Sequence, residues 1–167
     1  MTTEERELVM ALATKGMPQA DFLSRFRGSK DGQQLCSDLL TEAIGSKSAD
    51  DVEYALMVGY TFGFTDAHLK PLLDLASAPW HFKHEDVVTA LGQLKSPKAV
   101  EGLHAATKWI PEYLDFDESR ALAVKAIWAL GRIKGPEAEA ALSALIKDPD
   151  PILAESATVQ IERRRVV

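Results

Sequence analysis

Two histidines lie three residues apart near the middle of the chain. His81 and His84 are followed directly by Glu85, and residues at this spacing share one face of a helix, where a metal ion could bind them. The spacing differs from that of the zinc-protease helix, in which the histidines are four residues apart with a glutamate between them. Since the sequence offers no third ligand, we expect no metal and interpret these residues as polar groups at the start of a helix.

Carboxylates form three groups, each at the expected start of a helix. The groups are Asp50, Asp51 and Glu53, then Asp115, Asp117 and Glu118, and finally Asp148 and Asp150. Helix N-termini favour negative charge, so capping is the simplest interpretation of the first and last groups. The middle group differs because it follows the longest interruption of the helical pattern, and such insertions often form a binding surface.

Aromatic residues surround this middle group. Trp109, Tyr113 and Phe116 alternate with the acids, and aromatic anchors beside charge are typical of protein recognition surfaces. The alternative is that the aromatic rings fold inward over the core. Trp80 and His84 precede this segment and could line the same surface, or could simply pack at a junction between helices. The candidate partner-binding residues are therefore Trp80, His84, Trp109, Tyr113, Asp115, Asp117 and Glu118.

Familiar catalytic motifs are missing from the sequence. It contains no glycine-rich phosphate loop, no Walker element, no Cys-x-x-Cys pair and no serine nucleophile elbow. The single cysteine, Cys36, lies on the apolar side of an expected helix, which favours a small buried residue over a nucleophile. We therefore expect no catalytic residue and no cofactor.

The composition is that of an ordinary globular protein with an acidic balance. Of 167 residues, 46% are hydrophobic and 26% charged, and 19 basic against 25 acidic residues give a net charge of −6. This charge disfavours nucleic acid and favours a basic protein partner. Arg163, Arg164 and Arg165 form a basic run that suits a helix C-terminus and is too short for a nucleic-acid site. Without a secretory signal or a membrane-spanning run, we expect a cytoplasmic protein with no membrane contact and no small-molecule substrate.

Apolar residues recur at helical spacing almost everywhere, which predicts an all-α fold. The expected helices cover about residues 3–14, 18–26, 32–44, 48–60, 65–76, 83–94, 97–110, 118–134, 136–147 and 151–163. Thr3 is the expected cap of the first helix, and Gly45 is the expected end of the third. Ser48 and Asp51 have the spacing of a capping box.

The helix expected at residues 118–134 is apolar on two sides, which predicts that it is sandwiched between other helices. One face carries Ala123, Ala126, Ile127 and Leu130, and the other carries Val124, Trp128 and Gly131.

An internal repeat appears in the second half of the chain. Ala90, Leu91, Gly92, Leu94, Lys95, Ser96, Pro97, Ala99 and Leu103 align, at a constant offset of 39 residues, with Ala129, Leu130, Gly131, Ile133, Lys134, Gly135, Pro136, Ala138 and Leu142. The glycine allows two helices to approach closely, and the proline begins a new helix directly after the previous one ends. Each unit is therefore expected to be an antiparallel helix pair.

This pattern resembles the HEAT repeat family, in the bacterial form grouped with phycobilin-lyase-type HEAT-like repeats. The segment 148–152, with Ala157 and Ile161, resembles the start of a further unit. The resemblance is clearest over residues 84–163, weakens over 51–76 and is missing before residue 45. It implies one domain over residues 1–167, an α-α superhelix of about five helix pairs in which 48–163 form repeats and 1–45 are divergent or capping helices.

The resemblance implies a non-enzymatic module for protein–protein interaction. Combined with the acidic charge, it suggests an immunity or antitoxin-like inhibitor that binds a basic toxin or nuclease. Two alternatives stay open. One is a HEAT-like enzyme, similar to the glycosylases that remove alkylated DNA bases or to bilin lyases, although the net charge disfavours the first and no chromophore site is evident for the second. The other is a scaffold subunit of a larger complex.

Overall fold

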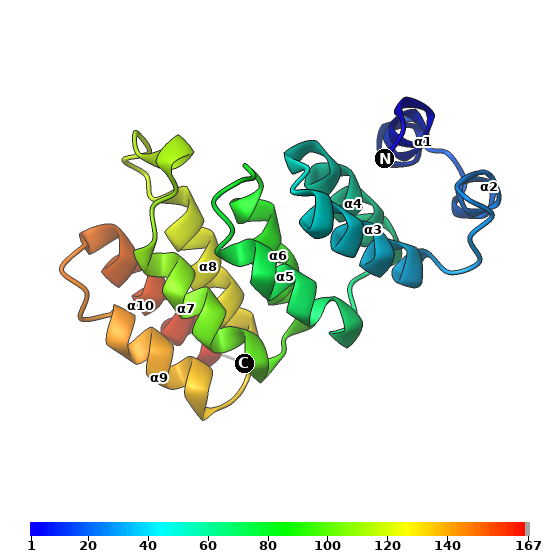
Figure 1. Ribbon diagram of the computed structural model, residues 1–167. Helices are drawn as coiled ribbons and strands as arrows, with labels where there is room; N and C mark the ends of the chain where they lie inside the picture. The colour runs from blue at the N-terminus through cyan, green and yellow to red at the C-terminus, as the bar shows by residue number, and fades with distance from the viewer. Residues whose placement is uncertain (166–167) are drawn as a thin grey trace. The chain divides into compact units, whose positions relative to one another are not determined.

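The computed structural model describes residues 1–165 and consists of α-helices joined by turns and short 3₁₀-helices (Figure 1). The α-helices are α1 (Thr3–Thr14), α2 (Gln19–Arg25), α3 (Gly32–Ser46), α4 (Ala49–Phe62), α5 (Leu69–Ala76), α6 (His84–Leu94), α7 (Val100–Lys108), α8 (Ala121–Arg132), α9 (Pro136–Leu145) and α10 (Pro151–Arg165). The 3₁₀-helices are η1 (Asp66–His68), η2 (Pro97–Ala99) and η3 (Glu112–Leu114). The all-α prediction is confirmed. Within residues 1–165, no helix has both the length and the apolar character needed to cross a membrane.

The helices form two compact units, Met1–Pro71 and the chain from Leu72 onward. In the first unit α4 packs against both α1 and α3, and α2 lies against α1. The fully buried side chains of this unit include Val9, Phe22 and Phe26. The rings of Phe22 and Phe26 lie 5.1 Å apart, so the short α2 contributes aromatic rings to this core.

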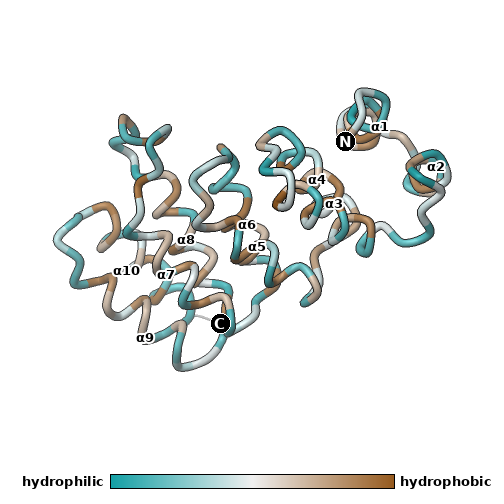
Figure 2. Tube along the Cα trace, in the orientation of Figure 1, coloured by the Kyte–Doolittle hydropathy of each residue, from teal (hydrophilic) through white to brown (hydrophobic). Residues whose placement is uncertain are grey.

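The second unit is built from two layers of helices. One layer consists of α6, α8 and α10, with α8 in the middle, and the other contains α7 and α9, which pack across α8 and α10. Hydrophobic residues recur along each of these helices in Figure 2. This is the repeat-like arrangement of helix pairs that the sequence predicts.

Helix α8 packs against both α6 and α10, which confirms that it is sandwiched, but its two predicted faces are not equally buried. Ala126, Ile127 and Leu130 are completely buried. On the other side Trp128 is 51% exposed.

Several predicted helix boundaries are wrong for identifiable local reasons. Thr2, not Thr3, caps α1, since its hydroxyl accepts a hydrogen bond from the Glu5 amide. Helix α3 continues through Gly45 and ends at Lys47, which adopts the left-handed conformation with φ of 50°. The carboxylate of Asp51 does not complete a capping box with Ser48 but accepts hydrogen bonds from Arg6, at 2.8 Å and 3.1 Å.

Two helices of the second unit approach each other closely at Gly92. A Cβ atom placed there would lie 2.8 Å from the Cβ of Ala129 and 2.9 Å from its Cα. Ala129 belongs to α8, so α6 and α8 are nearly in backbone contact. The predicted role of this glycine is confirmed. Gly131, its counterpart in the next repeat, faces instead the side chain of Gln160, whose Oε1 would lie 2.3 Å from the added atom.

This difference predicts unequal costs for the same substitution. Gly92→Ala should lower the free energy of unfolding of the second unit by about 1–3 kcal/mol, because the backbone of α8 must move. Gly131→Ala should cost less than half as much, since the end of the Gln160 side chain can rotate away. All three tryptophans, at positions 80, 109 and 128, lie in this unit, so urea unfolding followed by tryptophan fluorescence measures both variants. Equal costs would show that the α6–α8 contact is not the tighter one.

Candidate functional site

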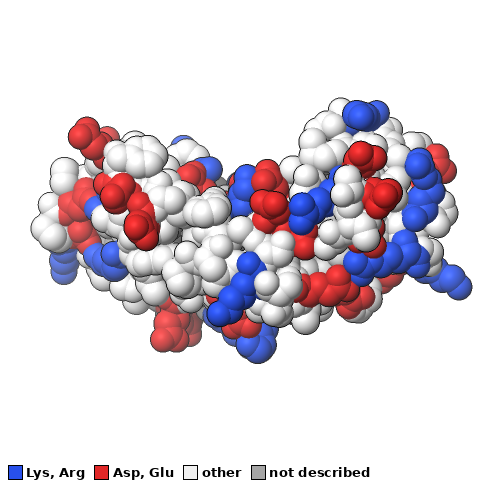
Figure 3. Space-filling view, turned by 45° about the horizontal axis from the view of Figure 1, so that its top comes forward, with Lys and Arg blue, Asp and Glu red and all other residues white. Residues whose placement is uncertain are grey.

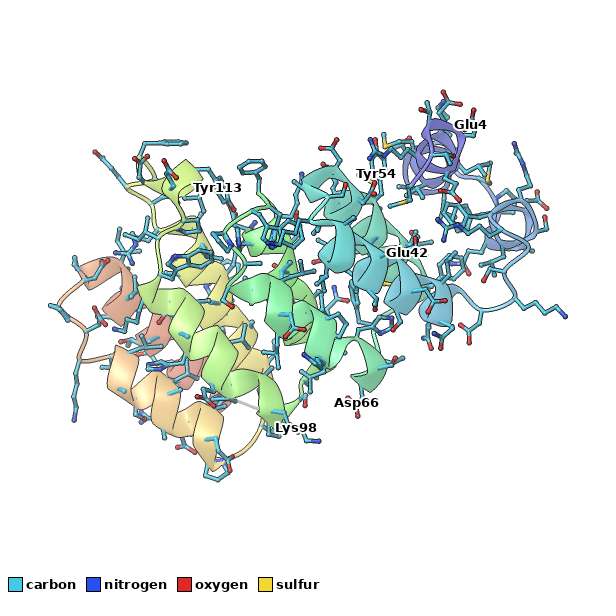
Figure 4. All side chains as sticks on the ribbon, in the orientation of Figure 1. Glu4, Glu42, Tyr54, Asp66, Lys98 and Tyr113 are labelled. Atoms are coloured by element: carbon cyan, nitrogen blue, oxygen red, sulfur yellow. The ribbon has the colours of Figure 1, made fainter. Side chains whose placement is uncertain are left out.

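The connection between α7 and α8, residues 109–120, is the longest loop of the second unit. It contains the single 3₁₀ turn η3 and returns over the start of α6, where Tyr113 lies beside His84 (Figure 4). The connection between α9 and α10, by comparison, spans only residues 146–150. The extra residues therefore form a surface that the neighbouring repeat lacks.

Beneath this connection the two histidines form a buried stack. The rings of His81 and His84 are both completely buried, with centroids 4.0 Å apart and planes inclined by 19°. Trp80 packs edge-on against His81 at 5.3 Å. Trp109 packs edge-on against His84 at 4.7 Å, and Tyr113 stacks on His84 at 5.6 Å. The interpretation of the histidines as polar surface groups is wrong, because the turn before α6 folds back over them.

The hydrogen bonds of the two histidines fix the orientation of both rings and require His81 to be neutral. His81 Nδ1 accepts from the amide of Lys83 at 3.1 Å, so its Nε2 donates to the carbonyl of Leu75 at 2.8 Å. His84 Nε2 donates to the carbonyl of Ala78 at 2.8 Å, which leaves Nδ1 to accept from the Tyr113 hydroxyl at 3.0 Å. The pair thus joins the end of α5, the start of α6 and the α7–α8 connection.

Burial is also the main reason why these rings resist protonation. It lowers the pKa of His84 to about 4, with a further contribution from the nearby His81. Burial likewise lowers the pKa of His81. At Tyr113, burial raises the pKa of the hydroxyl, and the carboxylates of Glu85 and Asp86 raise it further, against the hydrogen bond with His84. The rings are therefore a neutral support surrounded by negative charge.

Large apolar side chains are exposed above this support. Phe116 is 77% exposed and lies between Asp115 and Glu118, which are also exposed. Phe82 is 62% exposed and contacts the Tyr113 ring edge-on at 5.3 Å. We call Phe82, Tyr113, Asp115, Phe116 and Glu118 the acidic aromatic surface. In Figure 3, acidic side chains (red) lie around uncharged ones (white) on this part of the molecule.

Asp117 has a structural role within the same segment. Its carboxylate accepts hydrogen bonds from the amides of Ser119 at 3.0 Å and Ala121 at 2.6 Å. The pKa of Asp117 is lowered by these two bonds and, most strongly, by a hydrogen bond from the Ser119 side chain. Arg120 adopts a φ of 53° and forms an ion pair with Asp150 at 2.6 Å. For this reason α8 begins at Ala121 and not at the predicted Glu118.

The structure brings together the aromatic residues of the predicted site, but the predicted residues differ in how deeply they are buried. Trp80, Trp109 and Tyr113 are half-buried around His84. His84 itself is completely buried, so it supports the surface and cannot contact a partner directly. Phe82 was missed by the sequence analysis, and its neighbours Trp80 and His81 were the only signal of an aromatic cluster there.

The other candidate groups have structural explanations. Asp150 caps α10, since its carboxylate accepts from the Ile152 amide at 3.0 Å, and Asp148 pairs with Lys108. Cys36 is completely buried, and burial raises the pKa of its thiol to about 12, as expected for an apolar residue. Among residues 1–165 there is no group of three or more histidine, cysteine or carboxylate side chains that could hold a metal ion.

Comparison with known families supports the repeat. Residues 122–148 match the family model of the PBS lyase HEAT-like repeat. These residues include most of α8, all of α9 and the turn between them, so the resemblance seen in the sequence is confirmed for this unit. No curated protein and no solved structure matches the chain.

The neutral histidines predict a loss of stability in mild acid. The unfolded chain binds a proton on His84 below pH 6.5, whereas the folded chain does so only near pH 4, so stability falls as the pH falls through this range. The contribution of His84 is at most about 3 kcal/mol. Urea unfolding of the wild type and of His84→Gln, at about pH 7 and about pH 5, measures it. The variant should be less stable but less dependent on pH. A pH dependence equal to that of the wild type would contradict the assignment.

The capping role of Asp117 predicts a contrast with its neighbour. Asp117→Ala should lower the free energy of unfolding by about 1 kcal/mol, since the first amide of α8, at Ala121, and the preceding amide of Ser119 lose their acceptor. Asp115→Ala should change it by less than about 0.5 kcal/mol, because Asp115 is exposed. Both are measured by urea unfolding at neutral pH. Equal stability of the two variants would mean that Asp117 is as free to contact a partner as Asp115.

Proposed function

We propose that this chain, which carries a PBS lyase HEAT-like repeat at residues 122–148, is a non-enzymatic module that binds a basic protein through the acidic aromatic surface. The observation that carries the proposal is the 77% exposure of Phe116 between two exposed carboxylates. Helical repeats of this kind commonly act in protein interaction or as scaffolds. A large, solvent-exposed aromatic ring is a typical anchor residue of such a binding surface.

The energetic contributions of this surface are complementary. Burying a phenylalanine side chain contributes about 1.5–3 kcal/mol, and this surface offers two, Phe82 and Phe116. The carboxylates of Asp115 and Glu118 attract a basic partner and raise the rate of association. Because the Tyr113 hydroxyl is hydrogen-bonded to the buried His84, the support beneath Phe82 is already ordered before a partner binds. This order lowers the entropic cost of binding.

The more specific form of this proposal is an immunity or antitoxin-like inhibitor. A toxin nuclease needs a basic groove to hold nucleic acid, and a protein with a net charge of −6 and an exposed acidic aromatic surface suits such a groove. The net charge argues in the opposite direction for a glycosylase-like enzyme, which must itself hold DNA. A scaffold role would use the same surface, but it would place the chain in an assembly of several components.

Affinity capture from the native host tests the proposal. The tagged chain is used at low and at about physiological salt, and the retained proteins are identified by mass spectrometry. We expect one basic protein in equimolar amount whose retention falls as salt increases. Retention of nucleic acid or of a coloured chromophore without a protein would contradict the proposal and favour an enzyme. Capture of many subunits in fixed ratio would favour the scaffold.

Charge reversal then locates the surface. The double variant Asp115→Lys and Glu118→Lys should remain folded and should bind the captured partner at least about tenfold more weakly. Asp117 is left unchanged because it caps α8. The matched control reverses two other exposed acids, Glu7 and Glu155, and produces the same net charge. Equal weakening in both variants would show that only overall charge matters and that the α7–α8 connection is not the interface.

A further inference from the structure

A second feature of the second unit lies away from the acidic aromatic surface. The end of α8, the start of α9 and the end of α10 come together at one edge of the unit (Figure 1). Between them lies a hollow of about 680 Å³. Its lining includes Trp128, Arg132, Lys134, Gly135, Gln160 and Arg163. This volume is that of a site for a small organic molecule and is far larger than a single ion requires.

Gln160 is the unusual residue of this hollow. It is 6% exposed, and its Nε2 atom has no hydrogen-bond partner among the described residues. A buried amide without a partner destabilises the folded protein, so such groups are rare unless a ligand satisfies them. The Gln160 side chain faces the backbone of Gly131 at the wall of the hollow. Because Gln160 lines the hollow but its Nε2 atom is enclosed, a rotation of the side chain brings this N–H to an acceptor in the hollow.

The repeat makes the presence of this glutamine more informative. Ala157 and Ile161 of α10 correspond to Ala126 and Leu130 of α8, which places Gln160 at the position of Ala129. Ala129 faces Gly92 just as Gln160 faces Gly131. A small apolar residue would thus complete the contact between α8 and α10, and a long polar one stands in its place. Helix packing does not explain that exchange.

Positive charge converges on the same hollow. Arg132 and Arg163 occupy corresponding positions on α8 and α10, and Lys134 lies in the turn before α9. All three are exposed, and none of them forms an ion pair with another residue in the range 1–165. Arg164 is different, since its guanidinium donates to the carbonyls of Leu130 at 2.9 Å and of Ile133 at the end of α8. In a chain of net charge −6, this grouping of cations is suited to an anion.

Further groups define the rest of the ligand. Helix α9 begins at Pro136 without a side-chain cap, so its first amides have no acceptor from a capping residue, and Glu137 and Glu139 are the acids of its first turn. Trp128, 51% exposed, offers a flat apolar face at the rim. Glu139 adds one carboxylate to the lining, which can accept hydrogen bonds from a hydroxyl or amino group. The combination suits a ring, a sugar-like polar part and an anionic group.

We propose that this hollow binds a nucleoside phosphate. The phosphate lies against Arg132, Lys134 and Arg163 near the start of α9, because guanidinium and ammonium groups bind phosphate oxygens well. The base stacks on Trp128, and an acceptor atom of the ligand takes the free N–H of Gln160. This proposal is independent of the protein-binding function, since the two sites share no residue.

Tryptophan fluorescence and calorimetric titration test the proposal on the full chain. The probes are adenosine and guanosine monophosphates and diphosphates and cytidine and uridine monophosphates, with inorganic phosphate and adenosine as controls that each lack one part. We expect at least one nucleotide to bind with Kd below about 1 mM at physiological salt, and more tightly than either control. Phosphate that binds as tightly as every nucleotide, or the failure of all probes to bind, would overturn the proposal.

Variants of the lining locate the site. Arg132→Glu should weaken nucleotide binding at least about tenfold, whereas the matched control Lys147→Glu, at an exposed position outside the hollow, should not. Trp128→Phe should remove the change in fluorescence that the nucleotide causes. Binding that is unaffected by Arg132→Glu and Trp128→Phe lies elsewhere and overturns the assignment.

Gln160→Met separates a ligand-binding role from a structural one. Methionine has nearly the same volume but no amide, so the unliganded variant should unfold at an equal or higher urea concentration than the wild type. The same variant should bind the nucleotide about tenfold more weakly. A variant that is less stable and binds normally would show that Gln160 serves the fold alone and would overturn the proposal.

Discussion

The second unit depends on one steric constraint, the near contact of α6 and α8 backbones at Gly92 and Ala129. No side chain larger than a hydrogen atom fits at Gly92 without movement of α8. This contact fixes the separation of the two helices, and with it the distance from Tyr113, which is hydrogen-bonded to His84 at the start of α6, to the start of α8. The same geometry recurs between α8 and α10, where Gly131 faces Gln160. A glycine that faces a residue of the next helix therefore produces a tight contact at Gly92 and a polar hollow beside Gly131.

The buried histidines convert this helix arrangement into a defined surface. His81 donates to the carbonyl of Leu75 in α5, His84 donates to that of Ala78 in the turn before α6, and each ring accepts from a group on its other side. Because His81 must remain neutral for its bonds and burial keeps His84 neutral near pH 7, the support under Phe82 and Tyr113 depends on the absence of two protons. The carboxylates around this support act on it only through longer-range electrostatics and take no part in these hydrogen bonds.

The sequence predicts the helices well because apolar spacing is a local property, and it predicts the Gly92 contact because the repeat aligns that residue with Gly131. It fails where a side chain chooses among local partners. Asp117 bonds to amides beyond Glu118, and Arg120 adopts a left-handed conformation, so α8 begins later than apolar spacing suggests. The outward position of Phe116 and the burial of His84 depend on the path of the connection, which spacing does not define. The hollow joins three helix ends, and only the glutamine at an alanine position of the repeat could have indicated it. The single-domain organisation and the cytoplasmic location stay predictions.

The α7–α8 connection is held by few fixed points. Tyr113 bonds to His84, Asp117 caps α8, and Arg120 pairs with Asp150. Asp115, Phe116 and Glu118 lie between these anchors and support no helix. Evolution can therefore exchange these residues with little effect on folding, and related chains with the same anchors can acquire different partners. Except for Tyr113, the residues of this loop that form the proposed binding surface are therefore not the ones that hold the loop in place.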